Sequence, residues 1–282
     1  MGDSLKPIAA LSRADRCVYG SKATALGELT RAGFSVPDGV ALPMSVFDAV
    51  VDGAGLSERV RLYESDAASA TPRELIALET TMTGLFEGAA LSEPDTVALA
   101  AFAEEGTTFA VRSSAANEDL EGATFAGQYV SFLNVPPHLL VSRVLQCFAS
   151  LFGARAALYR RRKRIEGVGR MGVIVQQMVQ ASHSGIVFTK APRHPGKLLL
   201  ECGLGLCDAI VSGQLAPSRY YIDRSTLEID TAQETFSLSD SDIRRITQKA
   251  LVIEALMGHP QDIEYSILND DLLVLQARPI TS

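Results

Sequence analysis

The sequence lacks the short motifs that identify several common kinds of functional site. Its four cysteines form no C-x-x-C pair and its four histidines form no H-E-x-x-H, so their spacing predicts no zinc site. No G-x-x-x-x-G-K-[ST] is present, which excludes a P-loop. No apolar run approaches the roughly 20 residues that a membrane span requires. We therefore expect reduced cysteine thiols and a soluble, cytoplasmic protein.

Positive charge is also scarce. The 282 residues include 26 Lys and Arg against 33 Asp and Glu, a formal net charge of −7. This balance argues against general binding to nucleic acid or to an anionic membrane, because either needs a basic surface, but it leaves room for a local basic pocket. Hydrophobic residues make up 47% of the chain, as in ordinary globular proteins, and the length suggests one large domain or two packed lobes.

The hydrophobic pattern changes character along the chain. Residues before about 165 show mainly helical spacing, whereas those from Met171 onward show mainly the alternation of strands. This change predicts an α+β protein with two lobes, 1–170 and 171–282.

One long helix is predicted over residues 138–164, and it ends in the basic run Arg-Arg-Arg-Lys-Arg at 160–164. Such a run is typical either of a nucleic-acid patch or of a solvated helix C-terminus, where cations complement the helix dipole. The acidic net charge favours the second interpretation.

The last two predicted strands carry the most informative polar residues. Side chains alternate between the faces of a strand, so Asp262 and Glu264 share a face, as do Gln276 and Arg278 on the partner strand. If residues 269–271 form the loop, Glu264 lies opposite Gln276 and Asp262 opposite Arg278. The other face would then pack on the core through Ile263, Tyr265, Ile267, Leu273, Leu275 and Ala277.

The polar face of this hairpin has two interpretations. If another lobe covers it, its carboxylates, amide and guanidinium suit a divalent cation and a polyphosphate, because hard cations prefer carboxylate and amide oxygens and arginine binds phosphate. If it faces water, the same residues form a solvated surface with one cross-strand ion pair.

Three further segments could bind an anion, and each also has a purely structural interpretation. Residues 112–114 (Arg-Ser-Ser) and the loop at 124–128 could offer a guanidinium and backbone N–H groups to phosphates, or form a turn-rich connection. Lys22 begins a predicted helix, where an ammonium and free N–H groups favour an anion, although a single lysine there is usually on the surface. Glu201 precedes a Gly-rich stretch at 203–205, which lacks the third glycine of a Rossmann fingerprint.

Five segments carry a resemblance to a known family. They are 20–23 (GSKA), 111–128 (VRSSAANEDLEGATFAGQ), 177–179 (QMV) with 184–189 (SGIVFT), 201–214 (ECGLGLCDAIVSGQ) and 260–281 (PQDIEYSILNDDLLVLQARPIT). Together they resemble the nucleotide-binding domain of the pyruvate phosphate dikinase and phosphoenolpyruvate synthase family, which includes rifampicin phosphotransferase. The segments follow the family order over nearly the whole chain. The resemblance implies an ATP-grasp-like fold, in which two α+β lobes hold ATP between them.

The resemblance also implies roles for residues in the first lobe. Lys22 and Arg112 are similar to phosphate-binding cations that act in catalysis. The segment 124–128, which includes Thr124 and Gly127, is similar to a mobile loop that closes over the phosphates.

In the second part, the resemblance implies an adenine-binding segment at Gln177, Met178 and Val179 and a contact from Glu201 to adenosine or ribose. Its last hairpin is similar to a magnesium and phosphate site. There the resemblance implies that Asp262, Glu264 and Gln276 are ligands and that Arg278 is the catalytic clamp on the transferring phosphate. These roles suit phosphoryl transfer, in which positioning and charge neutralisation do most of the work.

The resemblance implies a phosphotransferase that uses ATP and Mg²⁺ and needs a second component. Full-length family members continue with a swivelling domain that carries a phosphorylated histidine, and none of the four histidines here lies in a similar context. We therefore expect a histidine partner on a separate polypeptide or a missing domain, with release of AMP, and no nucleic-acid or membrane partner. The alternatives are a direct-acceptor or ligase-type ATP-grasp enzyme that forms ADP, and a nucleotide-binding regulatory pseudo-enzyme.

Overall fold

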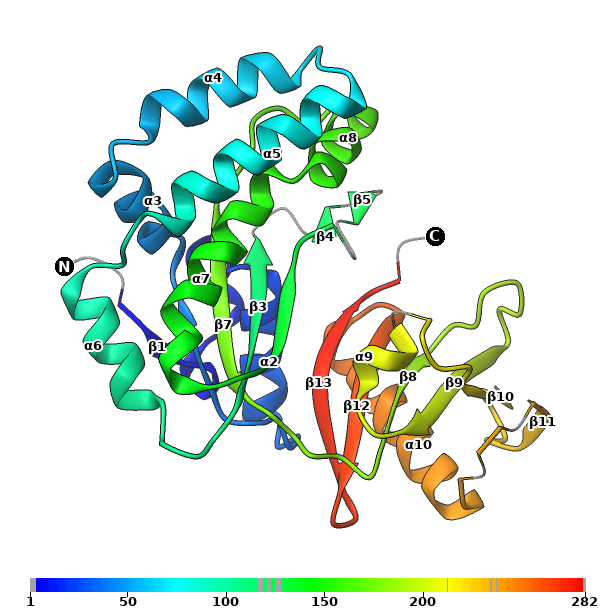
Figure 1. Ribbon diagram of the computed structural model, residues 1–282. Helices are drawn as coiled ribbons and strands as arrows, with labels where there is room; N and C mark the ends of the chain where they lie inside the picture. Colours follow the sequence, from blue (N-terminus) through cyan, green and yellow to red (C-terminus); the bar gives the residue numbers. More distant parts are fainter. Residues whose placement is uncertain are drawn as a thin grey trace. The chain divides into compact units, whose positions relative to one another are not determined.

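The computed structural model describes residues 4–280 except 116–118, 121–122, 125–127, 212, 234 and 237, and it does not describe the side chains of 119, 120, 123, 124, 209, 211 and 231. The chain forms two compact units, one made of 1–27 and 38–178 and the other of 28–37 and 179–282. Figure 1 shows their helices and antiparallel sheets, which confirm the expected α+β class.

The first unit contains an antiparallel sheet with the strand order β1-β2-β7-β3-β6. The strands are β1 (Lys6–Pro7), β2 (Gly39–Leu42), β7 (Met171–Gln177), β3 (Phe109–Ala115) and β6 (Ser131–Val135). β7 is buried over most of its length because it pairs with β2 on one side and β3 on the other. The units therefore divide after Met178, later than the 170/171 division expected from the pattern.

Helices pack around this sheet and enclose an aromatic core. They are α1 (Arg16–Tyr19), α2 (Ser21–Arg31), α3 (Met44–Gly53), α4 (Ser57–Ala67), α5 (Pro72–Glu87), α6 (Glu93–Phe102), α7 (Leu140–Ala149) and α8 (Ala154–Lys163). The rings of Phe47, Phe86, Phe148 and Phe152 lie with centroids between 5.4 and 6.5 Å apart. Tyr63 joins them, and its hydroxyl donates to the Phe152 carbonyl at 2.9 Å, which ties α4 to the turn before α8.

The chain between 138 and 164 forms two helices, so the prediction of a single long helix is wrong. After a 3-10 turn at Ser150–Phe152, Gly153 adopts an extended conformation with φ −61° and ψ 142°. Glu79 of α5 then accepts a hydrogen bond from the Ala154 amide at 3.1 Å and so satisfies a free donor at the start of α8. Within the described residues no single helix is long and apolar enough to cross a membrane, and only this pair, bent by 41°, meets that criterion jointly.

The second unit contains an antiparallel sheet with the strand order β11-β10-β9-β8-β12-β13. The strands are β8 (His183–Phe188), β9 (Lys197–Leu204), β10 (Ser218–Asp223), β11 (Ile229–Gln233), β12 (Gln261–Leu268) and β13 (Asp271–Pro279). Helix α10 (Asp240–Met257) and the short helix α9 (Cys207–Val211) lie on opposite faces of this sheet (Figure 1). Residues 28–37 join the unit because the Val274 amide donates to the Ser35 carbonyl at 2.8 Å.

Candidate functional site

The start of α2 lies directly against strand β3. Ser114 Oγ accepts a hydrogen bond from the Ala23 amide at 3.1 Å and donates to the Tyr19 carbonyl at 2.8 Å. Gly20, between them in sequence, has a φ of 86°, and a Cβ there would lie 2.1 Å from the Ser114 carbonyl oxygen. Only glycine therefore allows this close approach. The contact brings together the helix start and the Arg-Ser-Ser strand end that the sequence singled out.

Lys22 and Arg112 belong to these two segments. Lys22 is the second residue of α2, and Arg112 lies on the same face of β3 as Ser114, because alternate strand residues share a face; both side chains are half-buried. Ser21 is only 8% exposed, and its Oγ has no hydrogen-bond partner among the described residues. Two cations, a buried hydroxyl and a helix N-terminus favour a negatively charged ligand such as phosphate.

The loop that the resemblance assigns to the phosphates falls largely outside the described residues. Gly127 is not described at all. For Thr124 only the backbone is described, and it pairs with Asp119 in a short ladder formed by β4 (Asp119–Leu120) and β5 (Ala123–Thr124). The roles of Thr124 and Gly127 stay predictions.

The segment assigned to adenine lies where the chain leaves β7. The Gln177 amide donates to the Asp38 carbonyl at 2.8 Å, and the Met178 amide donates to the Thr108 carbonyl at 2.9 Å. These two amides are therefore occupied within the first unit. Any donor to a bound base from this segment would have to come from another group, and the next amide along the chain is that of Val179.

The last hairpin places its four polar residues opposite one another as predicted. Asp262 lies opposite Arg278, and Glu264 lies opposite Gln276. Directly opposed residues in a ladder share a face, so all four side chains belong to one face of the sheet.

The turn of this hairpin is tighter than the predicted three-residue loop. Only residues 269–270 link the strands, with φ values of 49° and 67°, as in a type I′ turn. A one-residue bulge at Leu275 restores the predicted pairing beyond it. Because the bulge reverses the alternation nearer the turn, the buried residues there are Leu272 and Val274, and the prediction of Leu273 and Leu275 is wrong.

The polar face extends across the neighbouring strands. Glu264 pairs with Ile186 of β8, and Ile186 pairs with Glu201 of β9. Glu201 pairs in turn with Arg219 of β10, whose Nε donates to Glu201 Oε1 at 2.6 Å. Ile186 also packs against α9, which gives this face an apolar patch beside its charges. Glu201 therefore lies on the same face as the hairpin residues, although it is far from them in sequence.

Asp262 and Arg278 form an ion pair through a single carboxylate oxygen. Arg278 Nε donates to Asp262 Oδ2 at 2.8 Å, and a terminal nitrogen lies 2.6 Å from the same atom. Asp262 is 7% exposed, and its Oδ1 is buried with no hydrogen-bond partner among the described residues. Burial raises the pKa of Asp262, Arg278 opposes that rise, and the charges of Glu264 and Glu201 add to it.

The oxygen atoms on this face are suitable ligands for a magnesium ion that is also coordinated by phosphate oxygens. Within the described part of the chain, no group of three or more His, Cys, Asp or Glu side chains could hold a metal ion. Asp262 and Glu264 supply two carboxylates, and the buried Gln276 supplies an amide. Mg²⁺ is commonly bound by one or two carboxylates together with waters and substrate phosphates. A cation would also satisfy the unpartnered Oδ1 of Asp262.

The sequence did not single out Ser21, Ser114 or Arg219 individually. Serine beside a helix start and arginine in an exposed strand are common, so neither carries a distinctive local signal. Their contacts depend on which strand lies beside which, and a strand order such as β10-β9-β8-β12 is not visible in the pattern of any single segment.

Comparison with known proteins shows what this chain is similar to. Residues 17–234 and 228–282 match the family model described as pyruvate phosphate dikinase, AMP/ATP-binding domain. The chain is 30% identical over 322 residues to a probable phosphoenolpyruvate synthase of Methanocaldococcus jannaschii, a match that covers 100% of this chain and 27% of that protein.

Two other relatives give the same result. A probable phosphoenolpyruvate synthase of Methanothermobacter thermautotrophicus is 30% identical over 308 residues, covering 96% of this chain and 45% of the relative. A rifampicin phosphotransferase of Streptomyces sviceus is 34% identical over 300 residues, covering 94% of this chain and 34% of the relative. The chain thus spans between 27% and 45% of the length of these three relatives.

Proposed function

Because this chain belongs to the family of the pyruvate phosphate dikinase AMP/ATP-binding domain, we propose that it binds Mg-ATP and transfers one phosphoryl group to a histidine on another protein or domain. The second phosphoryl group would go to water as inorganic phosphate, so that AMP is released. The proposal includes an ATP-grasp-like arrangement in which both units contribute groups to one nucleotide. The relatives include proteins named as phosphoenolpyruvate synthases and as a rifampicin phosphotransferase, which supports phosphoryl transfer as the reaction class.

The observation that carries the proposal is the polar face of the last hairpin. Asp262, Glu264, Gln276 and Arg278 share that face in register, and Asp262 keeps one buried acceptor without a partner among the described residues. A surface that served only solubility would not need a buried carboxylate whose pKa is raised by its burial. Such a carboxylate is instead suited to a cation.

At the phosphate end, Lys22 and Arg112 would neutralise the negative charge of the triphosphate, with Thr124 and Gly127 covering it. At the base end, the segment around Val179 would contact adenine, and Glu201 the ribose. Glu201 is held in place by Arg219 at 2.6 Å, so its carboxylate is already oriented before any ligand arrives.

At the reacting phosphate, Asp262, Glu264 and Gln276 would hold the metal ion. A bound Mg²⁺ supplies charge neutralisation and in-line positioning of the phosphates. Arg278 would bind the oxygens of the transferring phosphoryl group, where an arginine can contribute several orders of magnitude in rate. Without a ligand, Arg278 binds Asp262 Oδ2. If Arg278 moved from that oxygen to the phosphate, the Asp262 carboxylate would become available to the cation.

Binding and transfer are tested separately. Isothermal titration calorimetry with Mg-ATP should show saturable binding, and thermal unfolding should shift upward because ATP binds only the native state. Incubation of γ- and β-labelled ATP with the chain and a separately expressed swivelling domain of a full-length relative should yield AMP and an acid-labile phosphohistidine. ADP formation with a small-molecule acceptor and no phosphohistidine would favour the direct-acceptor alternative, and ATP binding without any turnover would favour the regulatory one.

Two substitutions test the assigned roles. Glu264→Gln and Arg278→Ala should abolish transfer, because each removes a charge from the polar face. The matched controls are Glu228→Gln and Arg244→Ala, which remove the same charges from exposed positions of the same unit and should retain wild-type transfer. Transfer at the wild-type rate in either hairpin variant would contradict the proposal.

A further inference from the structure

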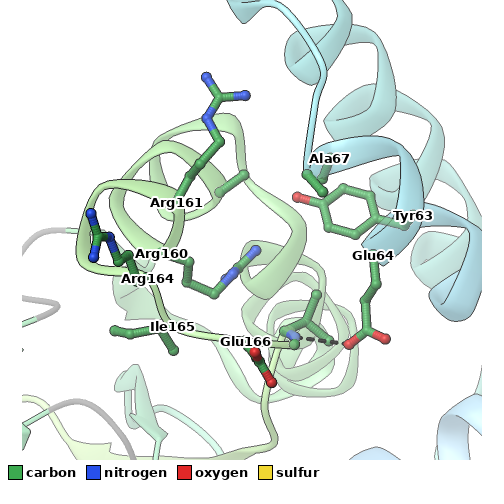
Figure 2. Close-up of a pocket in the computed structure, with 12 residues that line it drawn as sticks. Tyr63, Glu64, Ala67, Arg160, Arg161, Arg164, Ile165 and Glu166 are labelled. Carbon is green, nitrogen blue, oxygen red and sulfur yellow. Dashed lines mark hydrogen bonds between the residues drawn. The ribbon is translucent and has the colours of Figure 1, made fainter.

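A second candidate site lies within the first unit, and none of its lining residues is assigned to the nucleotide. A pocket of about 420 Å³ opens beside the C-terminal end of α8, a volume typical of small-molecule sites. Figure 2 shows that helix α4, helix α8 and the segment after α8 form its walls. Its lining residues are Tyr63, Glu64, Ala67, Arg160, Arg164 and Glu166, together with smaller apolar contacts and Arg161.

Arg160 is the central feature of this pocket. It is only 6% exposed, and its terminal nitrogen donates to the Leu151 carbonyl at 2.8 Å, but it forms no ion pair with a carboxylate among the described residues. The carboxylates of Glu64 and Glu79 accept instead from the amides of Val168 and Ala154, at 2.9 and 3.1 Å. A buried arginine is rarely left without a counter-ion, because desolvation of its charge is costly.

Figure 2 shows the Arg160 guanidinium directed toward Tyr63, whereas the side chains of Arg161 and Arg164 extend outward from the rim of the pocket. Burial raises the pKa of Tyr63, and Arg160 opposes that rise through its charge and a hydrogen bond. The basic run at 160–164 is therefore not uniformly solvated, as its pattern had suggested: its first member is buried and faces a pocket.

The backbone at Arg164 points to the same site. The Ile165 amide donates to the Arg160 carbonyl and the Arg164 amide to the Arg161 carbonyl, which is the Schellman pattern of helix termination. Arg164 itself adopts φ 55° and ψ 40°, the left-handed conformation in which glycine is strongly preferred at this position. Arg164 thus stays beside the pocket at a position where glycine would fit the backbone better, at some cost in stability.

We infer that this pocket binds a small organic oxyanion, a phosphate ester or a carboxylate, with Arg160 as the fixed counter-ion and Arg164 as an arm that closes over it. The carboxylates of Glu64 and Glu166 in the lining favour a ligand with a hydrogen-bond donor, such as an amino or hydroxyl group, at its other end. They disfavour a polyanion, so a nucleotide triphosphate is not the expected occupant.

The probes are phosphoethanolamine, β-alanine, inorganic phosphate and ethanolamine, titrated into the 282-residue chain by calorimetry and by amide NMR. Phosphoethanolamine and β-alanine separate a phosphate from a carboxylate head, and ethanolamine, which lacks the oxyanion, should not bind. Saturable binding of at least one oxyanion should move the amide resonances of Gly167 and Val168, which lie in the pocket wall.

Arg164→Gly gives the sharpest test because the expected effects on stability and binding have opposite signs. Glycine relieves the left-handed conformation, so the melting temperature should rise by about 2–4 °C. The loss of one charge-assisted contact should lower oxyanion affinity by roughly tenfold. Arg162→Gln is the matched control, because it removes the same charge from the same helix end but does not line the pocket, and it should leave affinity unchanged.

Three outcomes would overturn the inference. The first is that no oxyanion probe binds at 20 mM, roughly the weakest useful affinity for a single charged contact. The second is an equal loss of affinity in Arg164→Gly and Arg162→Gln. The third is binding that leaves the amide resonances of Gly167 and Val168 unchanged. None of these outcomes bears on Mg-ATP binding, which is measured in the same samples and involves different residues.

Discussion

Replacement of Arg278 by methionine should lower the free energy of unfolding, because the buried carboxylate of Asp262 would lose the guanidinium that neutralises it. Methionine keeps much of the apolar stem of arginine but removes the guanidinium that donates to Asp262 Oδ2 at 2.8 Å. Asp262, which is 7% exposed in the native protein, would then have neither oxygen paired among the described residues. The substitution thus tests whether this hairpin face contains a buried ion pair or merely a surface one.

The expected magnitude follows from the exposure of the two side chains, 21% for Arg278 and 10% for Asp262. Breaking a fully buried pair by removing one partner costs about 3–5 kcal/mol. Because a fifth of the guanidinium still contacts water, we expect a lower value of about 2–4 kcal/mol near pH 7. The control is Arg219→Met, whose side chain is 47% exposed in its pair with Glu201, and it should cost no more than about 1 kcal/mol.

The pH dependence of this effect has a definite sign. Burial raises the pKa of Asp262 in the folded protein, and loss of Arg278 should raise it further. A carboxyl with a raised folded pKa contributes stability below its unfolded pKa, and that stability is lost as pH rises through the folded value. The destabilisation in Arg278→Met should therefore be largest at neutral pH and shrink as the pH falls through the raised folded pKa of Asp262 toward its ordinary unfolded pKa of about 4.

Native-state hydrogen exchange of the β12 amides is the suitable assay, because it reports the local stability of the strand that carries Asp262. The double variant Asp262→Asn with Arg278→Met should recover most of the lost stability, since it leaves no buried charge unpaired. A cost below 1 kcal/mol, or a cost that grows as the pH falls, would refute the reasoning.

Three further predictions concern the backbone and a surface carboxylate. Gly20→Ala should destabilise the first unit by roughly 2–4 kcal/mol, measured by exchange of β3 amides, because its Cβ would lie 2.1 Å from the Ser114 carbonyl oxygen at a φ of 86°. Asp223 should titrate at about 2 in a carbon-detected NMR experiment, because the Ser225 hydroxyl and two following amides donate to it, and Ser225→Ala should raise that value. Asp270→Gly should raise the urea midpoint of the second unit by the equivalent of about 0.5–1 kcal/mol, because φ is 67° there, and an unchanged midpoint would argue against the left-handed turn.

Local sequence patterns were sufficient to predict the structure wherever residues close in sequence determine it. The bounds of α10 show this, because the signals that set them are local: the Ser239 side chain accepts a hydrogen bond from the Asp242 amide, and Gly258 ends the helix with a φ of 82°. The hairpin pairs at 262–264 were likewise correct, because strand alternation and a short loop restrict the possible registers. The same local motifs carried the family resemblance that the family model confirms.

The pairing of residues 262 and 264 with 278 and 276 was predicted correctly, although the loop on which that prediction rested was wrong. A two-residue turn and a bulge at Leu275 give the same register at the polar end as the predicted three-residue loop, but they place different apolar residues in the core. Nothing in the alternation of the strand marks the bulge, because it is set by how β13 packs against its neighbours.

Contacts between distant segments came only from the tertiary structure. The hydrogen bond from the Ala23 amide to Ser114 Oγ joins residues 91 positions apart, and Arg219 contacts Glu201 because β10 lies beside β9. The break at Gly153 depends on Glu79, a side chain of another helix. Burial of Arg160 is invisible in a run of five basic residues, because each has the same local pattern and only the tertiary packing around α8 separates the first from the rest.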